Sequence, residues 1–562
     1  MVATGGKINA RLRRRRRAVE IALIAAAAVL PFLSAVGSPF IFDDLNTIAQ
    51  NPALSQFDVA RFFTDPTAFS VKLGNWPYRP ALMTFDAIRL GFFGLDPRGW
   101  HLSELFLHLL NSLLVYLLAA RIFKLERTAF FAGLLFALSP LQTQSVIYLS
   151  ARSMVVACLP ALLAIMLAVR AREAEADKAW ALVAAAALTA LALLCSEGAM
   201  AVVAWAALAF YARGDALRDR RSYNVLLALA AVGVAYYLVR GSMKVPSPAE
   251  AIRISGGRFD LYEHFRVQLL APFVLLRLFL FPAGLSFFHL APPISATDLR
   301  FLLAVTGLAG IGFLLYRFRD RRALVAGVAW YFLSLLPSVF VPLNIPWAEH
   351  RAYLALPGLC LAAADLLGWL ADQAGSDRKK VFALRGMVAA VAVLLVLLSW
   401  GRARTYHSAE GLYRDAVRKS PAYYVAWNFL GADAYDRDDC RHAIAYLDRT
   451  IKLNPDFADA YNTRSACQLK SGDYIKAGDS AFQAIKLDPE NASYMNSLAV
   501  ILMTLDKYPE AEYWLSRALK IMAPNDPNRP TIEKNWRTLK AEMEPGAPGG
   551  EGEGEGATPG GE

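Results

Sequence analysis

The stretch Arg11-Leu-Arg-Arg-Arg-Arg-Arg17, the apolar residues 18–39 and the following Phe42-Asp-Asp44 decide how the chain is arranged around a membrane. An arginine cluster before an apolar segment is typical of a signal peptide. However, about 20 apolar residues without a small-x-small cleavage pattern favour a retained membrane span. Because basic flanks stay in the cytoplasm, residues 1–17 are expected to form a cytoplasmic tail. Asp43 and Asp44 then lie at the opposite mouth of the span.

The composition indicates a membrane protein with several spans and a soluble part. Of the 562 residues, 56% are hydrophobic and 19% are charged, which is more apolar than an ordinary soluble domain. The formal net charge is +11. Lys and Arg fall mostly in short runs between apolar segments, as in cytoplasmic loops, so nucleic acid is not expected as a partner.

Apolar segments predict about eleven spans within residues 18–402. After the first, they lie near 104–121, 129–145, 153–170, 179–194, 199–212, 224–240, 299–316, 322–342, 352–371 and 382–401. The segment 265–282 is expected to be interfacial, because two arginines and a proline suit a broken helix better than a clean span. An odd number of spans places the C-terminal half, and the large loop 40–103, outside the cytoplasm.

In this topology four polar clusters share the extracytoplasmic face: the loop with Asp43, residues 142–152, Glu197 and residues 344–353. Ionisable groups at the ends of spans are functional candidates. Each has a structural alternative: adjacent aspartates often form a solvated loop or a cap, and Glu197 can cap the next helix. His101 shares a helical face with His108 and can be satisfied by core neighbours.

Residues 403–543 follow a period of 34, which predicts tetratricopeptide repeats and a capping helix near 530–543. Pro421, Pro455 and Pro489 keep this interval, as do Ala409, Ala443, Ala477 and Ala511. Asn428, Asn462 and Asn496 recur at one offset. These amides either form a row that binds the backbone of an acceptor peptide or are simply polar residues on the surface of the helices. The Gly- and Glu-rich tail 544–562 is expected to be disordered.

The five cysteines give one hint about the compartment. Cys440 begins the second helix of one repeat and Cys467 ends the first helix of the next. These helices are neighbours in a stacked array, so we expect a disulfide between them, which requires an oxidising compartment. The other three cysteines lie in or beside predicted spans and need only packing to explain them.

Several short motifs follow one another in a specific order. They are Phe42-Asp-Asp44, Tyr78-Arg79-Pro80, Gly99-Trp-His101, Leu107-His-Leu-Leu-Asn111, Ser139-Pro140, Ser196-Glu197, Phe281-Pro-x-x-Leu285-Ser286 and Ala348-Glu-x-Arg-x-Tyr-Leu354, and then the repeats. This order resembles the transmembrane and tetratricopeptide-repeat (TMTC-like) branch of the GT-C glycosyltransferases, related to the protein O-mannosyltransferases. The chain departs from the pattern at Met154 and at Phe287-Phe288-His289, where such proteins often carry an acidic residue.

The resemblance implies an all-α chain in which a GT-C-type membrane domain precedes a tetratricopeptide-repeat α-solenoid. It also implies an inverting transfer of a sugar from a polyprenyl-phosphate-linked donor to an extracytoplasmic acceptor, a protein hydroxyl group recruited by the repeats. The lipid donor would bind beside the interfacial segment 265–282.

The residue chemistry assigns roles within such a transfer. Asp43 is expected to be the base with Asp44 supporting it, although the sequence does not order the two. Arg79, His350 and Arg351 would bind the departing lipid phosphate. Asp44 is alternatively a ligand of a divalent cation, Mg or Mn. The supporting candidates are His101, Arg152, Glu197, Glu349 and Tyr353.

Other functions fit parts of the same pattern. One alternative is a membrane-anchored tetratricopeptide scaffold for periplasmic partners, and another is a polyprenol-linked glycan ligase. A transporter is disfavoured because the charges gather at one face rather than mid-span. The Ala- and Arg-rich composition favours a bacterial inner membrane, with the N-terminus cytoplasmic and the repeats periplasmic.

Overall fold

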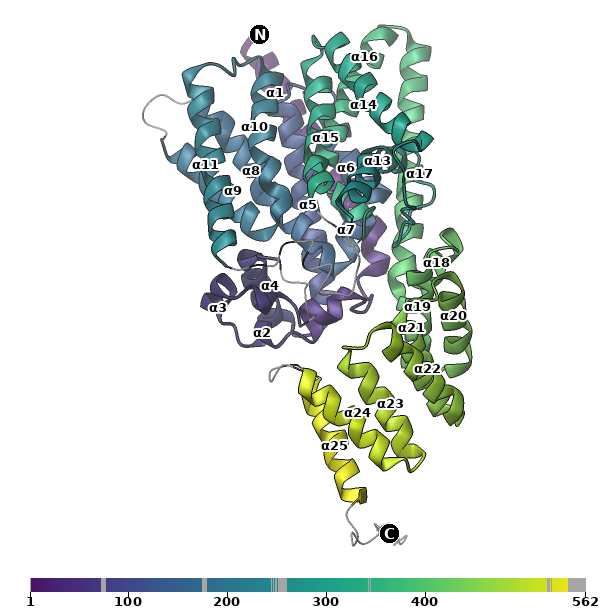
Figure 1. The fold of residues 1–562 in the computed structure, drawn as a ribbon. Coiled ribbons are helices and arrows are strands. Elements are labelled where there is room, and N and C mark those ends of the chain that lie inside the picture. The colour runs from purple at the N-terminus through teal and green to yellow at the C-terminus, as the bar shows by residue number, and fades with distance from the viewer. Residues whose placement is uncertain are drawn as a thin grey trace, which may run out of the picture. The chain divides into compact units, whose positions relative to one another are not determined.

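The computed structural model describes residues 2–71, 77–173, 179–243, 260–341, 345–522 and 528–543, together with residues 245, 247, 250, 343 and 526. The side chains of residues 2–11 and the predicted disordered tail 544–562 lie outside the described residues. All regular secondary structure of the described residues is helical, which confirms the predicted all-α class (Figure 1).

The chain divides into two compact units, Met1–Ser420 and Pro421–Glu562. The first unit contains α1 (Val2–Val29), α2 (Pro52–Ser55), α3 (Val59–Thr64), α4 (Pro80–Phe93), α5 (Pro97–Arg121), α6 (Ala129–Leu138), α7 (Thr143–Ile147), α8 (Arg152–Glu173), α9 (Ala179–Cys195), α10 (Val202–Arg213), α11 (Arg220–Ser242), α13 (Leu261–Leu280), α14 (Leu299–Arg317), α15 (Arg322–Phe340), α16 (Leu356–Ala374), α17 (Arg378–Arg404) and α18 (Ala409–Lys419). The second contains α19 (Tyr424–Asp436), α20 (Cys440–Leu453), α21 (Ala458–Lys470), α22 (Tyr474–Leu487), α23 (Ala492–Thr504), α24 (Tyr508–Ile521) and α25 (Arg529–Met543).

Seven helices of the described chain are long and apolar enough to cross a membrane: Leu12–Ala35, Pro97–Arg121, Leu149–Glu173, Arg220–Ser242, Leu299–Arg317, Arg322–Phe340 and Arg378–His407. The pair Ala129–Leu138 and Pro140–Ile147, bent by 49°, makes an eighth if it counts as one span. The protein is therefore a membrane protein. The predicted count of about eleven spans and its orientation stay predictions, because length and composition do not settle them for the shorter helices such as α9.

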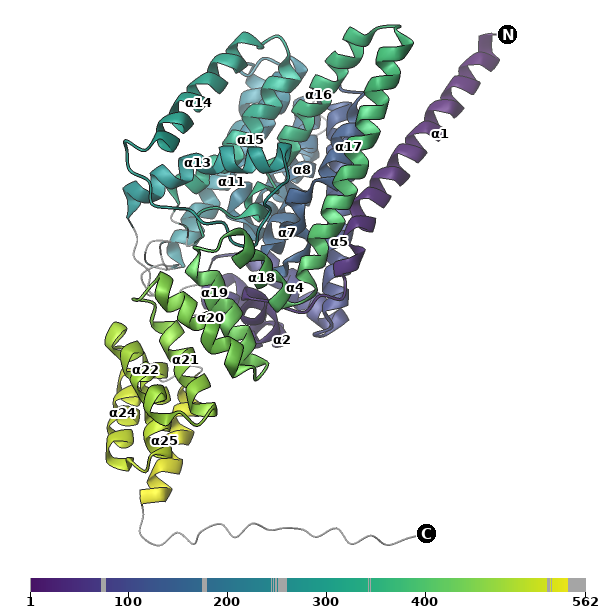
Figure 2. The same cartoon turned by 90° about the vertical axis from the view of Figure 1, so that its right-hand side faces the viewer.

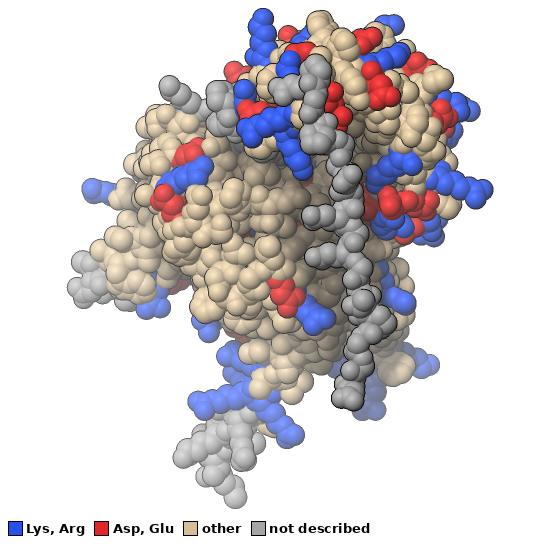
Figure 3. Space-filling view, turned by 90° about the horizontal axis from the view of Figure 1, so that it is seen from below, with Lys and Arg blue, Asp and Glu red and all other residues tan. Residues whose placement is uncertain are grey.

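Two features of the first unit bear on that topology. The arginines at residues 13–17 of α1 are exposed, and Figure 3 shows a group of blue side chains projecting at this end. The α13 helix contains Pro272 and runs across the direction of α14 and α15 instead of alongside them (Figure 2). This orientation is the one expected of an interfacial helix.

The described residues of the range 40–103, expected as a large loop, form a layer of short helices instead. Side chains of Asp58, Asp65 and Asp96 accept hydrogen bonds from backbone N–H groups at helix starts, and α4 begins at Pro80. These are the residue types that start helices. The apolar core of the layer includes Leu54, Phe62, Phe69, Leu82 and Met83, and it continues into α8 and α9 through Ala157 and Cys195. It therefore provides a rigid support for the motifs of this region.

The second unit is a stack of helix pairs. Ala443, Ala477 and Ala511 are all fully buried, because small side chains at these positions let neighbouring helices approach closely. A Cβ built on Gly431 would lie 2.8 Å from Leu447 Cγ, so this helix pair also needs its glycine. The solenoid is therefore built as the period of 34 predicts. The first helix of this second unit is α19. The period of 34 groups α18 with the repeats, but α18 belongs to the first unit.

Candidate active site

Asp44 ties the first extramembrane turn to a distant part of the first unit. One carboxylate oxygen accepts hydrogen bonds from the N–H and the Oγ of Ser150, both at 2.6 Å, and the other accepts from the N–H of Ile41 at 3.1 Å. Its side chain is buried, and burial raises its pKa to about 7. A carboxylate whose oxygens are held by three protein donors acts as an anchor, not as an open ligand.

Asp43 has a different environment from its neighbour. It is half-buried, and its carboxylate accepts a hydrogen bond from the Tyr148 hydroxyl at 3.3 Å. Its carbonyl accepts one from Thr47 Oγ1 at 2.9 Å. Phe42 before it has a φ of +54°, an uncommon backbone conformation for a bulky residue. The turn at Phe42 therefore leaves Asp43, of the two acids, partly accessible.

A buried ion-pair network lies beside Asp44. Arg152 pairs with Asp86 at 2.7 Å, and Arg89 pairs with both Asp86, at 3.5 Å, and Glu104. All four side chains are at most 2% exposed. Arg152 also donates to the carbonyl of Leu149 at 3.0 Å, so it holds the segment that contains Ser150. Arg152 therefore supports the acidic pair from behind.

Arg79 and Glu197, two separate sequence candidates, form one ion pair at 3.0 Å. Arg79 also donates to Ser153 Oγ at 3.3 Å. The cap at the start of the Glu197–Ala201 helix is the Ser196 side chain, which accepts from the N–H of Gly198, so Glu197 is not that cap. Because Glu197 neutralises the Arg79 guanidinium, this arginine has less charge to offer a phosphate than an unpaired arginine has.

The loop 349–353 is anchored by its first and last residues. Glu349 is fully buried and accepts from the N–H of Ser286 at 2.6 Å and from His289 Nε2 at 2.8 Å. The Tyr353 hydroxyl bonds to His108 Nδ1 at 2.9 Å and to the Asn111 amide at 3.1 Å. Both candidates therefore position the loop from inside the protein. His108, which is not among the site candidates predicted from the sequence, is a hydrogen-bond partner of the Tyr353 hydroxyl.

His350 and Arg351 lie between these anchors. The His350 N–H donates to Gln144 Oε1 at 2.9 Å, and burial lowers the pKa of the His350 imidazole to about 3. His350 is therefore neutral near pH 7 and provides no positive charge. Arg351 donates to the carbonyls of Ile345 and Pro346, the latter at 2.8 Å, and burial lowers its pKa only to about 10.

Arg351 therefore stays charged at neutral pH. Among the described residues its guanidinium has carbonyl partners but no carboxylate partner. In this respect it differs from Arg79, the other arginine predicted to bind phosphate.

Aromatic rings and one amide bring the Asp43 turn and the loop 349–353 together. The Phe42 ring lies 5.6 Å from the ring of Phe287, which lies 5.0 Å from the ring of Tyr148. Gln144 donates to the carbonyl of Phe287 at 3.4 Å and accepts from His350. Segments far apart in sequence therefore converge around Asp43, as the shared-face argument predicts. His101 supports the same turn by bonding to the carbonyl of Ser38 at 3.1 Å.

A second ion chain joins the loop 349–353 to α18. Arg402 lies 3.8 Å from Glu349 and 2.9 Å from Asp415, and Asp415 also pairs with Lys419 at 2.6 Å. The Lys419 amine also donates to the carbonyl of Leu285. Asp415 and Arg402 are at most 5% exposed. These contacts explain why α18 belongs to the first unit.

The structure contradicts the predicted disulfide and does not test the predicted metal. All five cysteines are free thiols, so the predicted disulfide is absent, although Cys440 and Cys467 are adjacent and hydrogen-bonded. No group of three His, Cys, Asp or Glu side chains that could hold a metal occurs in the described part of the chain. The Asp44 oxygens are already bound by Ser150 and Ile41. The divalent cation therefore stays a prediction from the sequence and enters no step below.

The asparagines of the repeats are not equivalent. The amide oxygens of Asn428 and Asn462 are buried and have no hydrogen-bond partner in the described structure. The amide oxygen of Asn496 accepts from the Asn535 amide of α25 at 2.8 Å. The capping helix therefore occupies the last of the three positions, and two amides of the row keep unused bonding capacity.

Sequence reasoning missed Asp86, Arg89 and Glu104 of this site. It included Gln144, Tyr148 and Ser150 only as members of the polar cluster 142–152 and gave them no individual role. One signal was present, because Asp86 and Arg89 stand three residues apart on the otherwise apolar α4, and charged residues on such a helix need buried partners. Ser150 and Gln144 carried no comparable signal.

Comparison with known proteins agrees with the architecture. A tetratricopeptide-repeat family model matches residues 430–486 and 476–530. A protein O-mannosyl-transferase of Caenorhabditis elegans is 25% identical over 462 residues, 78% of this chain and 63% of that protein. Human protein O-mannosyl-transferase TMTC3 is 22% identical over 494 residues, 79% of this chain and 52% of that protein. Human TMTC1 is 30% identical over 151 residues, 26% of this chain and 17% of that protein.

The curated relatives of this chain are thus TMTC protein O-mannosyltransferases, and the predicted resemblance to that branch is confirmed. The chain spans between about half and two thirds of the length of the two relatives that it matches over most of its own length.

The buried network predicts a specific pattern of stability. Arg152→Met leaves Asp86 without its nearest cation, so the free energy of unfolding should fall by about 3–5 kcal/mol. The double variant Arg152→Met, Asp86→Leu should recover most of that loss, because no unpaired charge remains. Unfolding in detergent by heat or dodecyl sulfate measures both.

Arg414→Gln is the matched control for this network, because it breaks the exposed pair with Glu410 and should cost under about 1 kcal/mol. Equal losses in Arg152→Met and Arg414→Gln would contradict a network that depends on burial.

The raised pKa of Asp44 predicts a pH dependence. The folded state keeps the proton up to about pH 7, whereas the unfolded state loses it near pH 4. The free energy of unfolding of the wild type should therefore fall as pH rises from about 4 to 7, by up to about 4 kcal/mol. Asp44→Asn should lack this fall, while the exposed Asp320→Asn should retain it. A pH series of unfolding curves tests this, and equal slopes for Asp44→Asn and wild type would refute it.

Proposed function

We propose that this chain is a membrane glycosyltransferase that moves a sugar from a polyprenyl-phosphate-linked donor to a hydroxyl group of an extracytoplasmic protein. The observation that carries this proposal is that Tyr148, Phe287 and Gln144 link the half-buried Asp43 to the loop of Arg351. Arg351 is a cation without a carboxylate partner among the described residues. The similarity to protein O-mannosyl-transferases supports the reaction class. Mannose is accordingly the first sugar to test.

The reaction needs few groups. The Asp43 carboxylate takes the proton of the acceptor hydroxyl as its oxygen forms a bond to the anomeric carbon. The bond from that carbon to the phosphate oxygen breaks, and its electron pair leaves with the lipid phosphate. Such a phosphate needs no proton to depart, so one base is sufficient, and attack opposite the leaving group inverts the anomeric carbon.

Arg351 is the group best placed to receive the developing phosphate charge. Its guanidinium has only carbonyl acceptors to satisfy, so a phosphate adds a charged partner without breaking an ion pair. The neutral His350 imidazole has a single N–H, and its Nδ1 lies 3.3 Å from the acceptor Gln144 Oε1, so we assign it no hydrogen bond to the phosphate. Arg79 contributes less, because Glu197 already pairs with it.

Asp44 and its neighbours support the base without touching the reactants. The bonds from Ser150 hold the turn that presents Asp43. Arg152 holds the segment of Ser150 in turn. The proposal therefore orders the two aspartates: Asp43 reacts, and Asp44 positions it.

The α19–α25 solenoid would recruit the protein acceptor. Repeats of this kind bind extended segments along a concave surface. The side chains of Asn428 and Asn462 offer donors to a peptide backbone through their amide nitrogens, because their amide oxygens are buried. The distribution of charged residues between the apolar segments supports a position of the repeats and the site outside the cytoplasm. The composition of the chain supports a bacterial periplasm as that compartment.

Removal of the base should abolish turnover while the fold remains. Asp43→Asn should lower kcat by about 10²–10⁴ in vesicles that contain a polyprenyl-phosphate mannose donor and an extracytoplasmic protein fraction. Arg351→Gln should lower kcat/KM for the donor by about tenfold or more.

The control for both variants is Asp320→Asn, an exposed acid in a different loop, which should keep full activity. Glycoproteomics of the extracytoplasmic fraction provides the readout in cells. If Asp43→Asn leaves every glycan unchanged while partners still bind the repeats, the chain is a scaffold and not a transferase.

The repeats predict a separate effect on acceptor affinity. Asn428→Ala together with Asn462→Ala should raise the KM for a protein acceptor by about tenfold, because two hydrogen bonds to its backbone are lost. Asn496→Ala should change it little, since that amide is already bound to Asn535. Initial rates at varied acceptor concentration measure the effect. Equal KM values for the double variant and for Asn496→Ala would exclude the side chains of Asn428 and Asn462 from binding of the protein acceptor.

A further inference from the structure

A large groove lies outside the site described above, between α6, α16 and α17. It has a volume of about 1200 Å³, above the usual range for pockets that bind small ligands. The start of α1 and the connection from α16 to α17 lie at one end of the first unit, and the α2–α4 layer lies at the other (Figures 1 and 2). The groove contains residues next to that connection, such as Asp372 and Gly375. It is therefore remote from Asp43.

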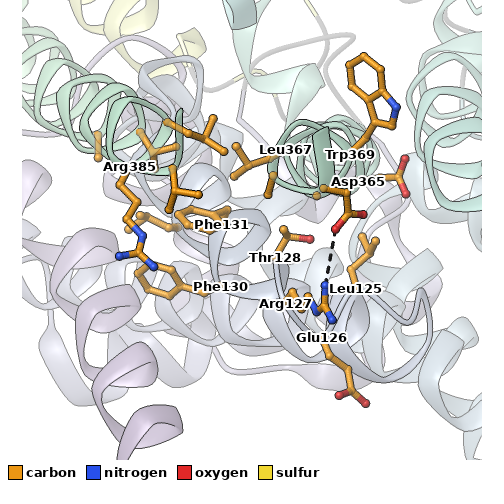
Figure 4. A pocket seen from close by; sticks show the side chains of 18 of the residues that line it. Leu125, Glu126, Arg127, Thr128, Phe130, Phe131, Asp365, Leu367, Trp369 and Arg385 are labelled. Carbon is orange, nitrogen blue, oxygen red and sulfur yellow. Dashed lines mark ion pairs between the residues drawn. The ribbon is translucent and has the colours of Figure 1, made fainter. Parts of the chain in front are cut away.

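One wall of the groove is apolar. Phe130, Phe131 and Leu134 of α6 line it together with Leu384 and Val388 of α17. In Figure 4 the two phenylalanines lie in its middle. The α17 helix is apolar enough to span a membrane, yet only 6% of its most apolar window is buried within the protein. A hollow against such a helix meets lipid in a bilayer, and apolar side chains there favour acyl chains over water.

The rim of the groove is charged. Arg127 pairs with Asp372 at 3.6 Å, and Arg321 pairs with Asp365 at 2.7 Å. Figure 4 shows Arg385 on the side opposite the Arg127 ion pair, with the phenylalanines between them. Neither Arg385 nor Lys124 has a carboxylate partner among the described side chains. The Lys124 amine donates instead to the backbone carbonyl of Arg213. The rim therefore has two cations in excess of its ion pairs, against one acid, Glu126.

The start of α6 adds to this charge. The helix begins at Ala129, and Leu125–Thr128 before it line the groove. The N–H groups at a helix N-terminus carry partial positive charge and attract anions. The apolar wall and the cationic rim thus suit an amphipathic ligand with an apolar chain at one end and an anionic group at the other.

We propose that this groove binds an anionic glycerophospholipid of the membrane, with an acyl chain along Phe130, Phe131 and Val388 and the phosphate at Arg385. Basic pockets between membrane helices on the cytoplasmic side recognise lipid head groups in this way, and the predicted topology places this end in the cytoplasm. The proposal is independent of the glycosyltransferase assignment.

The test uses the full chain purified in mild detergent and incubated with phosphatidylglycerol, with bound lipid counted by native mass spectrometry. The wild type should retain one phospholipid per chain. Arg385→Gln should lower the apparent affinity by about fivefold. Ala389→Trp, which fills the groove from α17, should abolish retention.

Two variants are matched controls. Ala390→Trp adds the same bulk to the next residue of α17, which is exposed but does not line the groove, and Arg317→Gln removes an exposed arginine at the end of α14. Both should retain the lipid as the wild type does. Equal retention in Ala389→Trp and Ala390→Trp would overturn the proposal. So would a lipid-free wild-type dimer that Ala389→Trp dissociates, because a second copy would then fill the groove.

Discussion

The buried ion pair between Arg152 and Asp86 is the interaction on which the candidate site depends. Taking these charges out of water costs several kcal/mol for each ion, and this cost is offset only when every charge has a partner in place. Arg89 and Glu104 complete the pairing. Because the four side chains come from α4, α5 and α8, their pairing sets how these helices meet. The acidic turn is then fastened to this frame through Ser150 and Asp44.

The two adjacent aspartates show how burial separates the roles of identical side chains. Asp44 accepts three hydrogen bonds, and burial raises its pKa to about 7. Asp43, one residue earlier, keeps partial access and one tyrosine contact. The arginines differ in the same way, since Arg79 has a carboxylate partner and Arg351 has only carbonyl partners in the part of the chain that the structure describes. Burial and pairing therefore distinguish Asp43 from Asp44 and Arg351 from Arg79 within the candidate site.

Much of the architecture was predictable from local signals. The period of 34 predicted the helix pairs of the repeats, and the apolar segments predicted most long helices of the first unit. The count of spans predicted that the loop with Asp43, Glu197 and the loop 349–353 share one membrane face, and that orientation stays a prediction. The prediction for Cys440 and Cys467 was correct about proximity and wrong about the bond. Adjacent helices bring two thiols together, but proximity does not decide their oxidation.

By itself, the sequence determined where helices form, which segments are apolar enough for a membrane, and which polar residues demand an explanation. Periodicity and hydropathy act over a few residues, so they can be read without the fold. Only the tertiary structure decided that Arg152 pairs with Asp86, that Glu197 neutralises Arg79, and that Ser150 anchors Asp44. These partners stand tens of residues apart or more. Whether a charge is paired, buried or free depends on packing that no local pattern contains.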